Sequence, residues 1–249
     1  MTVQRDGSIP ANASGGRPSS VPSVSVIIPT LNEAQNLPFV LNTIPDWVDE
    51  ILVVDGRSDD DSVRVAQVLR SNVRIIEEFR PGKGVALRRG FDEAACDIVI
   101  ALDADGSMDG SRIGAFCKAL ISGADFVKGS RFLQGGGSSD ITPFRRFGDG
   151  AIAFLLRLLY GARCSDVTYG YMAIWADRIK YLGIDHDGFE VETLIAIRAR
   201  RARLQVFELP CYESHRIHGI SNLNALRDGL RILRVIVTER FRSYPQGRC

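Results

Sequence analysis

The sequence contains no apolar run long enough to cross a membrane. Its most apolar stretch, residues 151–162, is interrupted by Arg157, whereas a spanning helix needs roughly 20 apolar residues. The first 22 residues are rich in Gly, Ser and Pro and contain no apolar segment of the signal-peptide type. We therefore predict no transmembrane span, and a disordered leader over residues 1–22 that stands outside the fold.

Cysteine is scarce and the net charge is close to zero. The five cysteines are odd in number and include no Cys-x-x-Cys pair, which argues against a disulfide framework and against a zinc site. A reducing cytosol is the simplest setting, so we expect a cytoplasmic protein. Because 31 basic residues nearly balance 30 acidic ones, giving a net charge of +1, nothing demands a nucleic-acid partner and we expect none.

The order of apolar patterns predicts one α/β domain. A chain of 249 residues, 45% of them apolar, can form one substantial core. From Val24 onward, short β-branched runs alternate with segments of helical periodicity, which is typical of βαβ units on a parallel sheet. We place the domain at residues 23–243 and a short tail at 244–249. The predicted strands are 24–29, 50–55, 73–77, 97–103, 125–128, 172–175 and 205–213.

Helical spacing and capping residues mark the helices. The apolar residues of 113–121 recur on one face, and Ser111 is the predicted N-cap of that helix. Ser58 and Asp61 resemble a capping box that opens the helix after strand 50–55. The remaining predicted helices are 151–160, 190–200 and 223–241.

Two carboxylates, Asp103 and Asp105, follow the apolar run 98–102 one residue apart. In an open parallel sheet, ligands bind beyond the carboxyl ends of the strands, so both acids can reach one cation. Mg²⁺ and Mn²⁺ prefer oxygen ligands and are usually held by one or two carboxylates plus substrate phosphates. The pair indicates a Mg²⁺ or Mn²⁺ site that also takes a diphosphate; the alternative is that the acids only serve a turn.

Asp55 and Lys83 each have a binding and a structural interpretation. Asp55 ends strand 50–55, where it faces a ligand or forms a turn, whereas the acids at 59–61 are helix-start charges favoured by the helix dipole. Lys83 is flanked by glycines, so this segment is a flexible turn or a loop whose lysine reaches a phosphate.

Together these elements resemble the family 2 glycosyltransferases of the GT-A fold, especially the polyprenyl-phosphate (dolichol-phosphate) mannose and glucose synthases. The resemblance runs from Val24 to about Arg242. It implies a mostly parallel, Rossmann-like sheet flanked by helices, with a nucleotide-sugar-binding half over 23–132 and an acceptor-binding half over 133–243. The matching segments are 25–33 (SVIIPTLNE), 51–55 (ILVVD), 81–84 (PGKG), 102–105 (LDAD), 128–132 (KGSRF), Asp166, 169–171 (YGY), 188–192 (GFEVE) and 216–223 (RIHGISNL).

The resemblance also implies roles for individual residues. Asp103 and Asp105 match the acids that hold the metal and the donor diphosphate. The nucleotide-binding residues, with Lys83 added from its glycine context, are Pro29, Thr30, Asn32, Glu33, Asp55, Lys83 and Asp103. Arg131 is assigned to catalysis, and guanidinium groups suit bidentate phosphate contacts. The residues assigned to the acceptor and its phosphate are Ser107, Arg145, Arg146, Arg216 and Ser221.

Several acids and two histidines lie among the later motifs. Asp166 and Glu190 are the predicted catalytic acids that face the acceptor, and Glu192 is a further candidate base; the alternatives are a turn cap for Asp166 and a solvated helix position for Glu192. His215 and His218 either complete the metal shell or belong to the surface and acceptor loop, and we expect the second role. Two departures from the family pattern are Gly-Arg-Ser after Asp55 and Gly106 after Asp105.

The resemblance implies inverting transfer of a hexose from a nucleotide-sugar of the GDP-mannose or UDP-glucose type. A polyprenyl phosphate acceptor needs no strong base because its second pKa is about 6, whereas a soluble hydroxyl acceptor needs one. Both acceptors stay open. A nucleotidyltransferase would carry a Gly-rich basic loop after the first strand, a dehydrogenase would carry Gly-x-Gly-x-x-Gly, and the two acids disfavour a non-catalytic binding module.

The helix 223–241 is amphipathic and basic. Its apolar residues recur at helical spacing beside four arginines, and a fifth follows at its end. One interpretation is a core-packing helix with a solvated basic face. The other, which we predict, is peripheral contact with the inner face of the membrane. The residues concerned are Leu223, Leu226, Leu230, Leu233 and Val237 with Arg227, Arg231, Arg234, Arg240 and Arg242.

Overall fold

The computed structural model describes residues 21–162, 164–220 and 225–242. The predicted leader therefore lies outside the described residues except for Val21 and Pro22, and the predicted tail lies outside them entirely. Ser221 of the predicted acceptor loop and Leu223 of the predicted last helix also lie outside the described residues.

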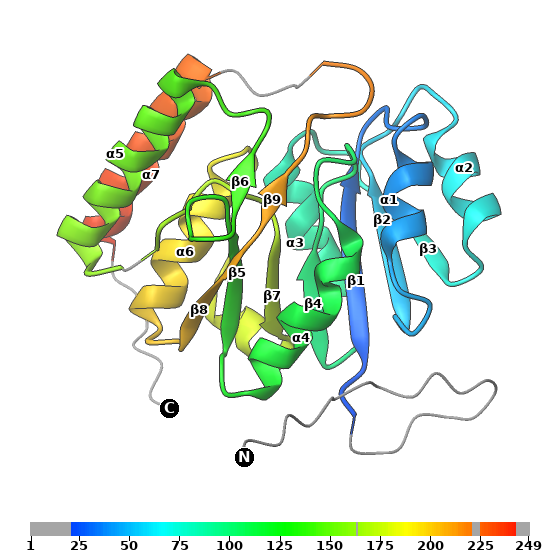
Figure 1. The fold of residues 1–249 in the computed structure, drawn as a ribbon, viewed down its shortest axis with the longest axis horizontal. Helices are drawn as coiled ribbons and strands as arrows, with labels where there is room; N and C mark the ends of the chain where they lie inside the picture. Colours follow the sequence, from blue (N-terminus) through cyan, green and yellow to red (C-terminus); the bar gives the residue numbers. More distant parts are fainter. Residues whose placement is uncertain (1–20, 163, 221–224, 243–249) are drawn as a thin grey trace, which may run out of the picture.

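A mostly parallel sheet of seven strands forms the centre of the described chain (Figure 1). Its order is β3-β2-β1-β4-β7-β5-β8, and β7 alone runs antiparallel to its neighbours. The predicted α/β domain with a mostly parallel sheet is confirmed. A second sheet pairs β6 with β9. The strands are β1 (Val24–Thr30), β2 (Glu50–Asp55), β3 (Val73–Glu77), β4 (Ile98–Ala101), β5 (Phe126–Ser130), β6 (Gly137–Ser138), β7 (Met172–Trp175), β8 (Val206–Pro210) and β9 (Tyr212–Glu213).

Helices cover both faces of the large sheet. In β1, Val26 and Ile28 belong to one core with α1, α2 and α4, and Ile27 belongs to another with α3 and α6, because successive strand side chains point to opposite faces. A third core joins α6 to α5 and α7, which form an outer layer (Figure 1). The helices are α1 (Leu37–Thr43), α2 (Ser62–Leu69), α3 (Lys83–Glu93), η1 (Gly110–Arg112), α4 (Ile113–Ile121), α5 (Pro143–Tyr160), η2 (Ala176–Tyr181), α6 (Val191–Arg201) and α7 (Ala225–Phe241).

The described helices include none that is both long enough and apolar enough to span a bilayer.

Two predicted helix starts are wrong. α5 begins at Pro143 rather than at 151, because the Thr142 hydroxyl accepts a hydrogen bond from the Arg145 amide and proline suits the first turn. Asp109, not Ser111, caps the turn before α4, since its carboxylate accepts from the Ser111 amide.

The predicted capping box before α2 is also wrong. The Ser58 hydroxyl donates to Asp55, and Asp61 pairs with Arg64 instead of with a backbone amide. Sequence patterns also missed α1 and α3, and α3 begins at Lys83 inside the segment interpreted as a turn or phosphate loop.

The predicted strand 205–213 is two strands in two sheets. β8 ends at Pro210, which has no amide hydrogen to donate to a ladder, and β9 starts after Cys211. The predicted strand 97–103 is shorter, so Asp103 lies just beyond β4 rather than inside it.

Candidate active site

Asp103 lies beyond the carboxyl end of β4 and pairs with a lysine from α3. The Lys83 Nζ atom lies 2.6 Å from Asp103 Oδ1 and 2.7 Å from Glu192 Oε1. Glu192 is 4% exposed, so its interpretation as a solvated helix residue is wrong. Gly170 runs beside the three side chains, because a Cβ atom there would lie 2.7 Å from Asp103 Oδ2. The fold thus brings two acids onto one largely buried ammonium group.

The Lys83 ammonium keeps its charge despite burial. Burial alone lowers its pKa, but the carboxylates of Asp103 and Glu192 outweigh that effect, so the pKa lies above its ordinary value. Burial raises the pKa of Glu192, and Lys83 offsets only part of that shift. A charged lysine therefore lies directly beside Asp103.

Asp105 faces a second cation, Arg216. The Arg216 Nη1 atom lies 3.6 Å from Asp105 Oδ2, while Nη2 pairs with Glu33 and Nε donates to the His218 carbonyl at 2.7 Å. The Arg216 side chain is 18% exposed. Each acid of the pair thus has its own basic partner, one from α3 and one from the segment that follows β9.

The segment 214–220, orange in Figure 1, crosses the carboxyl edge of the sheet. The Ser214 amide donates to the Ser107 carbonyl at 2.9 Å, and the Ile217 amide donates to the Asp105 carbonyl at 3.2 Å. Gly106 has φ +78°, and a Cβ atom on it would lie 2.5 Å from Ile217 Cδ1. Glycine is therefore favoured here by its backbone conformation and by the close approach of Ile217.

The predicted nucleoside residues Asp55 and Asn32 hold turns beside this edge. Asp55 is 3% exposed, and its carboxylate accepts the Ser58 hydroxyl at 2.6 Å and the Ser58 amide at 3.0 Å. Asn32 has φ 57°, and its side chain accepts the Asp59 amide at 2.8 Å. The turn interpretation of Asp55 therefore holds, and its role in nucleoside binding stays a prediction.

The other predicted nucleoside residues end β1 and follow it. Pro29 is half-buried, and the buried Thr30 donates its hydroxyl to the Ile28 carbonyl at 3.0 Å. Glu33 is 7% exposed and holds both Arg216 and the amide group of Asn36. Glu33 thus connects the nucleoside side of the edge to the segment 214–220.

Arg131 follows β5 and is enclosed by carboxylates. Its Nε and Nη2 atoms donate to the two oxygens of Asp166 at 2.7 and 2.9 Å. Nη1 lies 3.1 Å from Glu213, and Nη2 lies 3.4 Å from Asp149. Arg131 is 4% exposed and Asp166 is fully buried. A phosphate would have to displace a carboxylate to reach this guanidinium group.

Negative charge is in excess around Arg131, because three carboxylates surround one cation. Burial alone lowers the pKa of Arg131, but Asp166 and the other acids raise it above its ordinary value. Burial raises the pKa of Asp149, against the effect of Arg131. Asp149 and Glu213 carry no local sequence signal for this role, and only the fold brings them together.

Glu190 directly precedes α6, and Ser107 follows the acid pair beyond β4. Glu190 is 8% exposed, and its Oε1 atom accepts the Gly188 amide at 3.2 Å. Among the residues described, its Oε2 atom is buried and has no hydrogen-bond partner. Ser107 is buried, and its amide donates to Asp105 Oδ1 at 3.0 Å.

Arg145 and Arg146 lie in the first turn of α5. The Arg145 guanidinium donates to Asp140 at 3.3 Å, and the Arg146 guanidinium carbon lies 5.6 Å from the centroid of the Phe132 ring. Asp149 lies on the same helix and contacts Arg131. Arg145 and Arg146 are therefore only a few residues away from the carboxylates that surround Arg131.

Neither late histidine joins the acid pair. The His215 side chain is 70% exposed and lies 3.4 Å from Asp140, and the His218 ring packs 6.0 Å from the Phe39 ring. In the part of the chain that the structure describes, no three His, Cys, Asp or Glu residues are grouped to hold a metal. Asp103 and Asp105 are 25% and 24% exposed, which fits a cation that takes further oxygens from a diphosphate.

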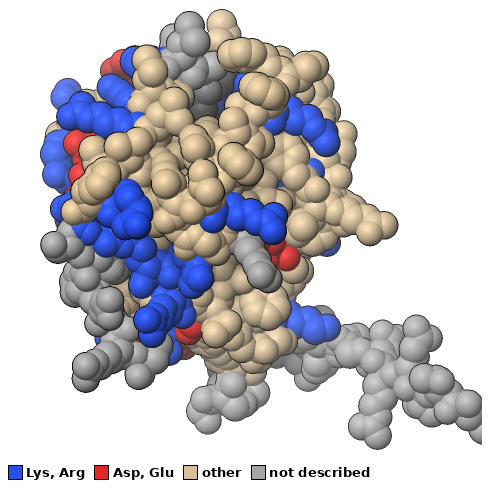
Figure 2. Space-filling view, turned by 90° about the vertical axis from the view of Figure 1, so that its left-hand side faces the viewer, with Lys and Arg blue, Asp and Glu red and all other residues tan. Residues whose placement is uncertain are grey.

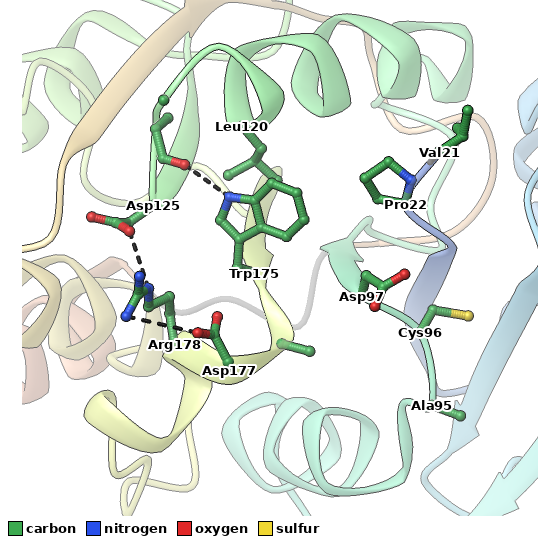
Figure 3. A pocket seen from close by; sticks show the side chains of 13 residues that line it. Val21, Pro22, Ala95, Cys96, Asp97, Leu120, Asp125, Trp175, Asp177 and Arg178 are labelled. Atoms are coloured by element: carbon green, nitrogen blue, oxygen red, sulfur yellow. Dashed lines mark hydrogen bonds and ion pairs between the residues drawn. The ribbon is translucent and has the colours of Figure 1, made fainter. Parts of the chain in front are cut away.

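A cavity of about 820 Å³ lies at the opposite, amino-terminal edge of the sheet (Figure 3). Asp97, Asp125 and Trp175 line it, and the Trp175 ring nitrogen donates to the Ala124 carbonyl at 3.0 Å. None of the predicted site residues lines this cavity. Because ligands of open α/β sheets bind at the carboxyl edge, the acid pair remains the candidate active site.

Comparison with known proteins identifies the family. Residues 25–179 match the family described as Glycosyl transferase family 2. The chain belongs to this family, and it is a glycosyltransferase. An uncharacterised glycosyltransferase of Mycobacterium tuberculosis is 42% identical over 109 residues, which are 44% of this chain and 49% of that protein. The match thus spans about half the length of that relative.

Relatives that align over most of the chain include enzymes named for polyprenyl phosphates. The polyprenol monophosphomannose synthase of Mycolicibacterium smegmatis is 30% identical over 80% of each chain. The undecaprenyl-phosphate mannosyltransferase of Micrococcus luteus is 29% identical over 81% of this chain and 87% of its own. The predicted resemblance to polyprenyl-phosphate synthases is confirmed at the level of the family.

The fold also matches a solved structure. Glucosyl-3-phosphoglycerate synthase from M. tuberculosis, crystallised with Mn²⁺, uridine diphosphate and phosphoglyceric acid, superposes with a TM-score of 0.71. The match covers 90% of this chain and 80% of that one, at 22% identity. At this identity the comparison shows the GT-A fold alone.

Proposed function

We propose that the protein transfers a hexose from a nucleoside diphosphate sugar, of the GDP-mannose or UDP-glucose type, to a polyprenyl phosphate. The observation that carries the proposal is the pair Asp103 and Asp105, two partly exposed carboxylates at the carboxyl edge of the sheet, each beside a basic side chain. The names of the relatives that align over 80–81% of the chain support the acceptor. Cytoplasmic location at the inner face of the membrane stays a prediction.

In the proposed donor site, Asp103 and Asp105 hold Mg²⁺ or Mn²⁺ together with the diphosphate. When bound, the metal neutralises charge on the departing diphosphate. Lys83 and Arg216 lie beside the two acids, and we propose that both basic side chains contact diphosphate oxygens of the donor. The nucleoside side is assigned to Pro29, Thr30, Asn32, Glu33 and Asp55.

Two of the candidate bases, Asp166 and Glu192, pair with basic side chains, which favours a phosphate acceptor over a hydroxyl. Both oxygens of Asp166 accept hydrogen bonds from Arg131, and Glu192 pairs with Lys83. Each of these two acids is thus already paired with a basic side chain. A phosphate monoester is largely ionised at neutral pH, because its second pKa is about 6, and it can attack the anomeric carbon without a base. We assign Arg131 and Asp166 to positioning the acceptor side of the site.

A soluble hydroxyl acceptor is the second candidate, and Glu190 favours it. Within the described residues, its buried Oε2 atom has no hydrogen-bond partner. An acid in this state can accept the proton that a hydroxyl loses as it attacks the sugar. A variant of Glu190 can therefore distinguish the two candidate acceptors.

The test is transfer from radiolabelled GDP-mannose and UDP-glucose to a short-chain polyprenyl phosphate in detergent, and separately to phosphoglyceric acid. Each reaction is run with Mg²⁺, with Mn²⁺ and with EDTA. We expect metal-dependent transfer to the polyprenyl phosphate, lost in Asp103→Asn. Transfer to phosphoglyceric acid alone would select the second candidate, and transfer unaffected by EDTA would refute the metal assignment.

A further inference from the structure

α5 and α7 form an outer layer of the described chain and lie side by side over α6 (Figure 1). Their inner faces share a core in which Ile152 and Leu156 of α5 pack with Ile232 and Ile236 of α7. The Tyr160 hydroxyl donates to the Ile236 carbonyl and ties the end of α5 to α7. The two helices therefore present one continuous outer surface.

The outer surface of this pair is apolar as well. On α5, Phe147 is 78% exposed, and on α7, Phe241 is 83% exposed. A helix that packs one face on a core normally carries polar residues on the other, and contiguous exposed apolar residues mark an interaction site. The outer apolar face, as we call it, consists of Phe144, Phe147, Phe154 and Leu158 of α5 with Leu230, Leu233, Val237 and Phe241 of α7.

The charge around the outer apolar face is positive. α5 and α7 together carry seven arginines and three acids. All three acids are turned inward: Asp149 reaches Arg131, and Asp228 and Glu239 are each 1% exposed. Figure 2, which views this side, shows Lys and Arg beside a broad uncharged area with little Asp or Glu. The exposed arginines of the two helices are Arg146, Arg157, Arg227, Arg231, Arg234 and Arg240.

We propose that the outer apolar face docks on an anionic membrane surface. Apolar side chains of such a face enter the boundary between headgroups and acyl chains, while arginines contact the anionic headgroups. A second copy of the chain fits less well, because symmetric pairing brings identical surfaces together and would set arginines against arginines. A nucleic acid would match the arginines and leave the eight apolar side chains without a partner.

Docking in this way would turn the acceptor side of the site toward the lipid. Phe147 lies on the outer apolar face, and two residues later Asp149 lies 3.4 Å from Arg131 Nη2. The first turns of α5 therefore separate the proposed membrane contact from the Arg131 cluster. Only this step rests on the proposed function: the phosphate of a polyprenyl phosphate would meet Arg145 and Arg146 at the level of the headgroups.

The test is flotation of the full chain with vesicles of phosphatidylcholine, with and without phosphatidylglycerol, at low and high NaCl. We expect binding to the vesicles with phosphatidylglycerol, and release by salt. Val237→Asp should weaken binding by about tenfold or more, because it places a carboxylate against anionic lipid. Val68→Asp, on the 77% exposed position of α2, is the matched control and should bind normally.

Arginine variants test the charge separately. Arg234→Gln should weaken binding about fivefold, whereas Arg64→Gln on α2 should leave it unchanged. Circular dichroism and melting temperatures identify any variant that has lost its fold. If Val237→Asp is such a variant, Phe154→Asp replaces it.

Three outcomes would overturn the docking proposal: equal binding of Val237→Asp and Val68→Asp, equal binding to both kinds of vesicle at both salt concentrations, or a dimer that Val237→Asp dissociates. Flotation needs neither donor nor acceptor, so its failure is distinct from failure of the proposed function. Transfer to a short-chain acceptor in detergent should be the same in Val237→Asp as in the unchanged protein.

Discussion

Lys83 lies 2.6 Å from Asp103 and 2.7 Å from Glu192, so one lysine joins the predicted metal-binding acid to a buried glutamate. The two partners differ in access, because the Asp103 side chain is 25% exposed and the Glu192 side chain is 5% exposed. A ligand can therefore replace Lys83 as the partner of Asp103 while Glu192 remains paired with Lys83. Glu192 would then keep Lys83 in place for the diphosphate.

This relationship predicts that stability and donor binding can be separated. Lys83→Met should destabilise the protein by about 3 kcal/mol, because it leaves Glu192 buried without its cation. Adding Glu192→Gln should restore most of that stability, since an amide has no charge to bury. Nucleoside diphosphate binding, measured by calorimetry beside urea denaturation, should stay weak in both variants. Recovery of affinity together with stability would mean that Lys83 acts only through the fold.

Asp105→Asn tests the acid pair. The variant keeps the shape of the side chain but loses the charge that attracts a divalent cation, and the several kcal/mol at stake correspond to a loss of turnover of about a hundredfold or more. The melting temperature should change little, because Asp105 is partly exposed. Asp92→Asn, an exposed acid of α3, is the control. Near-normal rates at limiting Mn²⁺ would remove Asp105 from the metal site.

Asp55 and Ser58 allow the binding role of Asp55 to be separated from its turn. Asp55→Ala removes both the carboxylate and the turn that it holds, whereas Ser58→Ala removes the hydroxyl that contacts Asp55 and the Asn32 amide and leaves the carboxylate. If Asp55 contacts the nucleoside, Asp55→Ala should weaken donor binding about tenfold and Ser58→Ala much less. Equal losses in calorimetry would assign the effect to the turn.

Local patterns in the sequence predict the sheet and the acid pair for a physical reason. Buried parallel strands read as short β-branched runs, and Asp103 follows such a run directly, so its place at the carboxyl edge needs no long-range information. The β strands at 50–55, 73–77 and 172–175 agree with the structure for the same reason.

Local sequence patterns do not predict which side chains pair with one another at the site. Glu192 lies 109 residues from Lys83, and Arg131 gathers acids from α5, β9 and the segment before β7. The local pattern around each of these acids is that of an ordinary surface residue, and only the family resemblance singles out Asp166 and Glu192. Their burial depends on which elements pack together, and a charge becomes buried only where the fold also supplies its counter-charge.

The Arg198–Glu239 pair between α6 and α7 predicts a pH effect. Burial raises the pKa of Glu239, but Arg198 outweighs it, so the pKa lies below its ordinary value of 4.5. The stability that this pair contributes is therefore present above about 4.5 and lost as the pH falls through the lowered pKa. Glu239→Gln should cost about 2 kcal/mol at neutral pH, because Arg198 loses one of its two acidic partners and keeps Asp185. The difference in the free energy of unfolding between Glu239→Gln and the unchanged protein should become smaller in acid.

Urea denaturation across that pH range measures the difference, with the exposed Glu77→Gln as the control. A gap between Glu239→Gln and the unchanged protein that stays constant into acid would show that the lost charge is not its cause.

Glu190→Gln discriminates between the two acceptors. Glutamine keeps a carbonyl oxygen for the Gly188 amide but cannot take a proton, so only a reaction that needs a base should suffer. Transfer to a polyprenyl phosphate should change less than about fivefold, whereas transfer to a hydroxyl should fall about a hundredfold or more and lose the acid limb of its pH-rate profile. Asp166→Asn is the contrasting variant, because breaking the Arg131 pair should impair transfer to either acceptor and lower the melting temperature. A loss of the acid limb in transfer to polyprenyl phosphate would show that Glu190 acts as a base even there, and that an ionised acceptor alone does not explain the reaction.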